Sequence, residues 1–588
     1  MNKKLQIVSL ILVGFSQFAF GQIKEERLIL DRKREPEVKR IEKKKTSIPA
    51  EKNYPPKEKK QQDSLNLRYD ITDVPAVSDF KTSTIQGADI SPDFKNDYQN
   101  NYFQIGYGNF GRLLADGNIS TVLENKNEVG ADIHYVSTDG LKKKYAWDSK
   151  QNSASIGAFL NSYGEKGKFN VNADFSRDAY NYYGIYALNP SSDINIKQNV
   201  NQFKVNGYYD FYSNDILNDV RVKSSFLSDH YKAKETTADI NLNLSKHAVD
   251  VYTDVVMNAD LGVDIQTQKT EFELLNKNSS NFFNFGLTPK VTFFKGESYI
   301  SIGSNFSFLS GENSNILMSD AVKTSKTYWF PKAELLLAAT DEFKFFAGVD
   351  GGLKINSYSN LLQNNPYLLS DQYLTPTETK YHIYFGLKGD FAQDFKYNVS
   401  AGHAKINNVM FFKGNGLFDQ NIQTLRAGWD HANTFSATYD NGTLSEIKAS
   451  VQYFPLQNLV LDGELTFQKY KLDNYDDIYN IPLVKAEFGA KYTMLQKKLM
   501  LGFKGFFVTD RTTNLFEYTE LNPIYAEQQF ANRKVGGYAD INLSAEYKIH
   551  QNFSIFAQGN NLLNANYQTF NGYKVLGAQF LGGVKITF

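Results

Sequence analysis

The seven histidines are the side chains of this sequence best suited to acid–base or metal-ligand chemistry, because imidazole titrates near neutral pH and binds metal ions. They show no His-x-x-x-His or Glu-x-x-His spacing, and there is no Gly-x-Ser-x-Gly elbow. We expect His403 and His431 on neighbouring strands, yet a pair without a third ligand makes a weak metal site. The sequence therefore predicts that the chain is no enzyme and holds no catalytic residue, metal or cofactor.

Two further chemical patterns are excluded by context or by composition. Gly106, Gly108 and Gly111 formally match the dinucleotide-binding spacing, but they lie in a strand-like segment rather than between a strand and a helix. Cysteine is absent from all 588 residues. This absence excludes a disulfide scaffold, a thiolate metal site, an Fe–S cluster and a lipid-modified N-terminal cysteine.

Charge and hydropathy narrow the class of protein further. Lys and Arg number 64 and so do Asp and Glu, and this balance gives no reason to expect a nucleic acid as a partner. The mean hydropathy is −0.44 with one long apolar run, which excludes a helical membrane protein, because each spanning helix needs roughly 20 mostly apolar residues. The chain nevertheless contains 45 Phe, 37 Tyr and 3 Trp. Rings in this number need a place other than a water-soluble core.

The first hundred residues divide into three segments. Residues 1–21 are typical of a secretory signal peptide, with a basic start, an apolar core and small residues before Gln22. Residues 22–63 carry 14 Lys and Arg against nine Asp and Glu, with four prolines, which predicts a disordered basic arm in the periplasm. Residues 64–101 mix Val, Ile and Phe with acidic residues, and we expect a short extended segment that docks in the lumen of the domain that follows.

From residue 102 to residue 588 apolar and polar residues alternate with a period of two, as in 484–494 and 539–550. Connections alternate between short and long, which is typical of a transmembrane barrel with periplasmic turns and extracellular loops. The pattern predicts an all-β, up-and-down antiparallel β-barrel of about 22 strands. We expect tight turns near Asn125, Glu165, Ala248, Gly296, Asp341, Asp394 and at 455–457, 496–498 and 550–552, and a slightly longer turn near Leu217. We expect longer loops at 140–150, 187–200, 270–280, 312–324, 358–378, 413–425, 473–482, 513–533 and 564–576.

Clusters of aromatic residues lie toward the predicted strand ends. This position favours girdles at the two membrane interfaces, and the alternative is a stacking surface for sugars or flat ligands. The clusters are Tyr180, Tyr182, Tyr183 and Tyr186, and Tyr208, Tyr209, Phe211 and Tyr212.

The C-terminal segment carries a more specific signal. An aromatic-rich strand at 553–558 is followed by Asn-Leu-Leu-Asn at 561–564, a Gly-containing loop and a terminal strand that ends in Phe588. This order resembles the last two strands of TonB-dependent receptors. The resemblance implies a barrel in the outer membrane of a Gram-negative cell, contact with outer-membrane lipid, and recognition of the last strand by the barrel-assembly machinery. The residues that would form this C-terminal signal are Phe580, Val584, Ile586 and Phe588.

The resemblance stops before the barrel. TonB-dependent receptors place a folded plug there, whereas only 79 residues, 23–101, precede the first predicted strand, so we expect a barrel without a full plug. A lumen of 22 strands is normally plugged. We therefore expect the lumen to be closed by segment 64–101, by inward-folded loops such as 358–378 and 513–533, or by a partner protein. Tyr69, Ile71, Thr72 and Val74 loosely resemble a TonB box.

Two functions follow from these expectations. The first is a passive channel or the membrane scaffold of an envelope complex, with the basic arm contacting a periplasmic or surface partner protein. The alternative is active TonB-dependent uptake of a siderophore or glycan, which would make TonB a partner. The C-terminal motif is specific for the barrel and names no substrate.

Overall fold

The computed structural model describes residues 101–588 except 124–126, 142–146, 186–192, 213–215, 392–393, 422–423 and 520–526. The predicted signal peptide, the basic arm and the segment up to residue 100 lie outside the described residues. The TonB-box-like residues Tyr69, Ile71, Thr72 and Val74 lie outside them as well.

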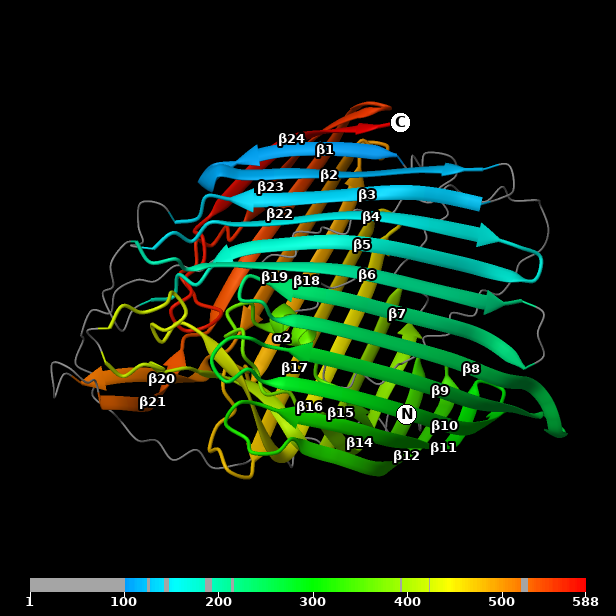
Figure 1. The fold of residues 1–588 in the computed structure, drawn as a ribbon. Coiled ribbons are helices and arrows are strands. Elements are labelled where there is room, and N and C mark those ends of the chain that lie inside the picture. Colours follow the sequence, from blue (N-terminus) through cyan, green and yellow to red (C-terminus); the bar gives the residue numbers. More distant parts are fainter. Residues whose placement is uncertain are drawn as a thin grey trace, which may run out of the picture. The chain divides into compact units, whose positions relative to one another are not determined.

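Twenty-two antiparallel strands form one closed sheet, which confirms the predicted barrel (Figure 1). The first strand, β1 (Tyr102–Gly108), pairs with β2 (Arg112–Val122) and also with the last strand, β24 (Gln579–Thr587). The sheet therefore has no free edge, so the backbone N–H and C=O groups of every strand can pair with a neighbouring strand on each side. The other strands of the barrel are β3 (Asn127–Thr138), β4 (Gln151–Tyr163), β5 (Gly167–Asn181), β6 (Lys197–Phe211), β7 (Leu217–Asp229), β8 (Lys234–Tyr252), β9 (Val255–Glu271), β10 (Ser279–Lys295), β11 (Ser298–Ser314), β12 (Val322–Thr340), β13 (Phe343–Lys354), β14 (Thr377–Phe391), β15 (Phe395–Gly414), β16 (Phe435–Leu456), β17 (Leu459–Leu472), β18 (Val484–Met494), β19 (Leu499–Val508), β22 (Tyr538–His550) and β23 (Phe553–Asn560).

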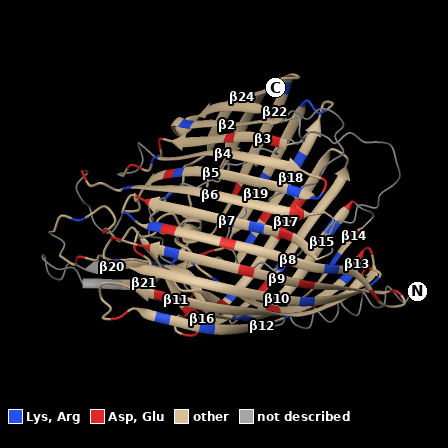
Figure 2. Cartoon of the chain, turned by 45° about the vertical axis from the view of Figure 1, so that its right-hand side comes forward, with Lys and Arg blue, Asp and Glu red and all other residues tan. Residues whose placement is uncertain are grey.

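The barrel wall is apolar outside and polar inside, as β14 illustrates. Ile383 and Phe385 are 54% and 59% exposed on the outer face. His382, which directly precedes Ile383, points to the opposite face and lies in the lumen, where its Nδ1 is 3.6 Å from Asp350 Oδ1 and its Nε2 is 3.2 Å from Glu446 Oε1. Charged residues accordingly occur along the strands as well as in the loops (Figure 2). An apolar exterior around a polar lumen is the arrangement of a transmembrane barrel.

The two ends of the barrel differ in their connections. At one end, which we call the turn end, every connection has two to five residues; the opposite end, the loop end, has most of the long ones. The sorted connections confirm the predicted alternation, with one shifted turn. Ala248 lies within β8, at φ 56° beside a register irregularity between Lys246 and Val249, and the hairpin turns at 253–254. The bulge was mistaken for a turn because both interrupt the alternation.

The predicted loop 513–533 is largely a β-hairpin. Its strands, β20 (Arg511–Thr519) and β21 (Glu527–Val535), pair in a separate two-stranded sheet that projects from the loop end (Figure 1). The expectation that this loop folds inward is wrong for the hairpin, which points away from the lumen (Figure 1).

Two short helical elements lie at the loop end. The 3-10 turn η1 (Asn109–Gly111) joins β1 to β2, and α2 (Tyr358–Asn364) lies between β13 and β14. Ser357 caps α2, because its side chain accepts a hydrogen bond from the Asn360 backbone N–H at 3.2 Å. In the part of the chain that the structure describes, no helix has the length and apolar character to cross a membrane.

Candidate functional site

Four long connections at the loop end pack together into what we call the loop closure. They are the described parts of the connections between β5 and β6 (182–185 and 193–196), between β13 and β14 (355–376), between β15 and β16 (415–421 and 424–434) and between β23 and β24 (561–578). Together with the adjoining strand ends they contribute most of the largest hydrophobic core among the described residues, and residues almost 400 positions apart in sequence meet there. The buried members of this core are Leu141, Tyr180, Tyr182, Tyr183, Ile185, Ile196, Val200, Leu227, Ala233, Phe272, Tyr358, Leu361, Leu362, Tyr367, Leu368, Leu374, Phe412, Phe435, Phe570, Tyr573 and Leu576.

A group of tyrosine rings joins the connections across the loop end. Tyr367 stacks on Tyr573 with ring centroids 3.4 Å apart, and it meets both Tyr180 and Tyr183 edge to face at 6.0 Å. Tyr183 in turn contacts Tyr573 at 5.0 Å. Aromatic pairs contribute about 0.5–1.5 kcal/mol each beyond the area that they bury. The rings therefore hold three connections, from separate parts of the barrel rim, in one packed unit.

The buried tyrosine hydroxyls also bond to backbone carbonyls of neighbouring connections. Tyr180 Oη donates to Pro366 O and Tyr182 Oη donates to Leu368 O, each at 2.6 Å. Tyr573 Oη donates to Asn433 O. Burial raises the pKa of Tyr182 well above its usual value, so this phenol stays a neutral donor. Each such bond contributes roughly 1 kcal/mol net, and breaking one leaves a buried carbonyl unsatisfied.

This arrangement overturns part of the predicted aromatic girdle. Tyr180, Tyr182 and Tyr183 are buried in the loop closure instead of facing the membrane interface, and Tyr186 lies outside the described residues. An aromatic residue near a strand end has the same sequence signature whether its ring points outward to lipid or inward to a loop. The second cluster lies at the turn end of β6, where Tyr212 is exposed, as a girdle requires.

Two buried carboxylates tie the connection 355–376 to its neighbours, one to the barrel wall and one to the β9–β10 connection. Glu235 of β8 is 3% exposed, and it accepts backbone N–H bonds from Tyr358 at 2.5 Å and Ser359 at 2.8 Å. Asp371 accepts backbone N–H bonds from Asn276 at 2.5 Å and Asn278 at 3.1 Å, in the β9–β10 connection. Charge-assisted bonds of this kind are roughly twice as strong as neutral ones. The connection is thus bonded to the wall near its start and to the β9–β10 connection nearer its end.

The connection 415–434 has its own buried ionic centre. Arg426 Nη1 lies 3.0 Å from Asp430 Oδ2, and Asp430 also accepts the Phe418 backbone N–H at 2.6 Å. Burial raises the pKa of the Asp430 carboxyl, although the backbone N–H groups of Phe418 and Asp419 and the Arg426 charge oppose the shift. His431 is 1% exposed, and burial, with the Arg426 charge as the second cause, lowers the pKa of its imidazole to about 4. His431 is therefore neutral at pH 7.

The structure does not support the histidine pair considered from the sequence. His431 lies in a connection rather than on a strand, so the prediction of neighbouring strands is wrong for it. His403 lies in β15, where its Nδ1 is 3.0 Å from Ser445 Oγ of β16. Over residues 101–588 with the gaps stated above, no three His, Cys, Asp or Glu side chains are placed to hold a metal ion.

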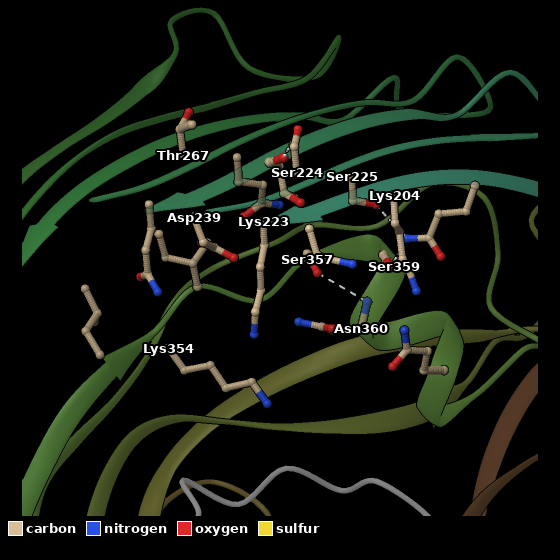
Figure 3. Close-up of a pocket in the computed structure, with 18 residues that line it drawn as sticks. Lys204, Lys223, Ser224, Ser225, Asp239, Thr267, Lys354, Ser357, Ser359 and Asn360 are labelled. Atoms are coloured by element: carbon tan, nitrogen blue, oxygen red, sulfur yellow. Dashed lines mark hydrogen bonds between the residues drawn. The ribbon is translucent and has the colours of Figure 1, made fainter. Parts of the chain in front are cut away.

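A polar cavity of about 490 Å³ lies in the lumen beside α2, and we call it the lumenal pocket. Its wall side comes from β6, β7, β8, β9 and the end of β13, and its closure side comes from residues 355–363, so that side chains of both converge on one space (Figure 3). No pattern in the sequence indicates this pocket, because its residues are spread over five separate segments. The lining residues are Gln202, Lys204, Asn206, Lys223, Ser224, Ser225, Thr237, Asp239, Gln266, Thr267, Gln268, Leu353, Lys354, Ile355, Ser357, Ser359, Asn360 and Gln363.

The predicted C-terminal signal residues lie together on the outer face of the barrel. The side chains alternate along β24, and those of the signal are exposed. They thus face the membrane side at the seam between β24 and β1. Recognition by the assembly machinery stays a prediction. The four residues are Phe580, Val584, Ile586 and Phe588.

Comparison with solved structures identifies the fold. The FrpB iron transporter from Neisseria meningitidis (F3-3 variant) matches with a TM-score of 0.60 at 11% identity, over 83% of this chain and 81% of that chain. The ferric-catecholate import receptor Fiu from E. coli K12 matches with a TM-score of 0.59 at 11% identity, over 83% and 81%. The pyoverdine outer membrane receptor FpvA from Pseudomonas aeruginosa PAO1 matches with a TM-score of 0.59 at 11% identity, over 83% and 78%.

Sequence comparison adds no closer assignment. No family model and no curated protein matches the chain. The structural matches confirm the fold that the predicted resemblance implies, a closed 22-stranded antiparallel barrel. The matched proteins are transporters and receptors. At 11% identity the likeness concerns the architecture alone.

Proposed function

We propose that the chain is an outer-membrane transport barrel whose loop closure gates the lumen. The observation that carries this proposal is the buried tyrosine core that joins connections from separate parts of the rim. A large apolar exterior and a polar lumen support a position in the outer membrane of a Gram-negative cell, with lipid around the barrel. The fold shared with an iron transporter and a ferric-catecholate import receptor supports a transport role.

The orientation follows from the sorted connections. Outer-membrane barrels have short turns on the periplasmic side and long loops on the extracellular side. The loop closure then lies at the cell surface, and the N-terminal basic arm lies in the periplasm, where it can contact a partner protein. The barrel-assembly machinery is the partner during biogenesis.

A gated barrel accounts for the packing better than a permanently open channel does. An open pore has no need to bury a core of aromatic rings at its mouth, and each buried tyrosine hydroxyl would lose a hydrogen bond on opening. In this proposal the closure performs the sealing that a plug performs in TonB-dependent receptors. A sealed barrel that serves only as a membrane scaffold is the competing reading.

Single-channel conductance in planar bilayers tests the gate. We expect the purified full chain to be mostly silent, and we expect a variant in which a short Gly-Ser linker replaces 355–376 to give large, long-lived currents. Heat-modifiable migration on gels controls for a folded barrel. Large stable currents from the unaltered chain would show a passive channel, and silence from both proteins would show a lumen closed by other means.

Active TonB-dependent uptake is the second candidate, favoured by the fold of the iron and ferric-catecholate proteins. Under this candidate the TonB-box-like segment transmits energy from the inner membrane. Deleting residues 23–74 should then abolish energy-dependent uptake of a ferric siderophore while the barrel stays folded. Uptake that is unchanged by the deletion, or insensitive to an uncoupler, would exclude this candidate.

A further inference from the structure

We infer that the lumenal pocket binds a small anion that also carries hydroxyl groups, and that the bound anion links the loop closure to the barrel wall. The chemistry shared by carboxylates and phosphates is what the pocket recognises. This inference rests on the proposed gating function, because it supplies a ligand that acts on the same closure.

The charge of the pocket favours an anion. Three lysines and one aspartate line it, so positive charge is in excess. Lys204 and Lys223 come from neighbouring wall strands β6 and β7, and Lys354 comes from the end of β13. Asp239 lies directly opposite Lys223 on β8. A recess with an excess of one charge sign concentrates ions of the other sign, and an ammonium group binds carboxylate or phosphate as a point charge.

The neutral lining favours hydroxyl groups on the same ligand. Ser224, Ser225 and Thr237 supply hydroxyl groups on the wall side. A hydroxyl both donates and accepts hydrogen bonds, so hydroxyl groups on the ligand can pair with these side chains in either sense. Ser357, Ser359 and Asn360 add further polar groups on the closure side. The volume of about 490 Å³ lies within the roughly 300–1,000 Å³ of small-molecule sites.

The pocket joins the gate to the wall. Gln202 Nε2 of β6 donates to Ser225 Oγ of β7 and to Ser359 Oγ of α2, each at 2.7 Å. A ligand held between Lys223 of the wall and Ser357 or Ser359 of the closure contacts both sides at once (Figure 3). Because this pocket exists only while α2 rests against the wall, binding stabilises the closed state by mass action.

Isothermal titration of the purified full chain in detergent tests the inference. The probes are glucose 6-phosphate and gluconate, with glucose as the neutral probe and inorganic phosphate as the bare anion. Lys223→Met and Lys354→Met each remove one pocket charge. Lys290→Met is the matched control, because Lys290 faces the lumen from β10, 3.3 Å from Asp260, and does not line the pocket. Heat-modifiable migration shows that each variant folds.

We expect saturable binding of glucose 6-phosphate or gluconate, at least tenfold weaker in both pocket variants and unchanged in Lys290→Met. Inorganic phosphate should bind at least tenfold more weakly, and glucose should not bind. Absence of saturable binding by both sugar anions, equal binding of glucose, or an equal loss in Lys290→Met would overturn the inference. Such a failure leaves the conductance of the loop-replaced variant unaffected, so it is distinguishable from a failure of the gating proposal.

Discussion

Replacing Glu235 by Gln should loosen α2 from the barrel wall and raise the fraction of open gates. The carboxylate accepts the backbone N–H groups of Tyr358 and Ser359 at 2.5 and 2.8 Å, and Thr270 Oγ1 donates to it at 2.7 Å. Glutamine keeps one acceptor oxygen, so an NH₂ group must face one of these donors. A hydrogen bond to a charged group contributes about 1.5–3 kcal/mol. A loss of about 2 kcal/mol raises the open-to-closed ratio roughly 30-fold.

Planar-bilayer recording measures this ratio directly as the time spent in conducting states. Glu271→Gln is the matched control, because Glu271 lies at the same end of the barrel and pairs with Lys269 at 2.9 Å on the exposed surface, where such a pair contributes little. We expect frequent openings for Glu235→Gln. Glu271→Gln should open no more often than the unaltered chain does. Equal behaviour of the two variants would refute the reasoning that the buried carboxylate holds the gate.

Three further predictions follow from the closure and the seam. Tyr573→Phe removes the donor to Asn433 O, so we expect about 1–3 kcal/mol less closure stability, seen as more frequent openings, with the exposed Tyr212→Phe as control. Because the pKa of His431 is about 4 in the closed state against 6.5 for a free imidazole, closure stability should be full above about pH 6.5. It should fall by about 3 kcal/mol toward pH 4. Protonation of Asp430, whose pKa is raised in the closed state, opposes this fall at the acidic end of the range. Currents should therefore increase on acidification, and less so in His431→Gln. Phe588→Ser should slow barrel assembly, measured as the rate at which the heat-modifiable form appears in cells, whereas Phe588→Tyr should assemble normally.

The sequence predicted the barrel well because strand alternation is a local signal. Each wall strand must place apolar side chains toward lipid, so its residues alternate. The alternating segment 484–494 is indeed a strand, β18 (Val484–Met494). The number of strands followed from the sorted connections. The bulge at Ala248 was misread because a positive φ and a break in alternation also mark turns.

Much less of the candidate site than of the barrel could be predicted from the sequence. The loop closure depends on contacts such as Tyr183 with Tyr573, which no local pattern predicts. The lumenal pocket depends on strand register, which sets Lys223 opposite Asp239. The strand count does predict that a wide lumen must be sealed, and an inward-folded loop at 358–378 is one of the three predicted ways of sealing it. The strand count thus predicts that the lumen needs a seal, but it does not predict which residues form that seal.

Thiol labelling on whole cells tests the central claim, that the surface connections are packed into a closure. The chain has no cysteine, so single cysteines report cleanly. Leu368 is 0% exposed within the closure, and Leu425 is 87% exposed in a neighbouring connection. With a membrane-impermeant maleimide, we predict rapid labelling of Leu425→Cys and at least 100-fold slower labelling of Leu368→Cys. Equal labelling rates at the two positions would contradict the account.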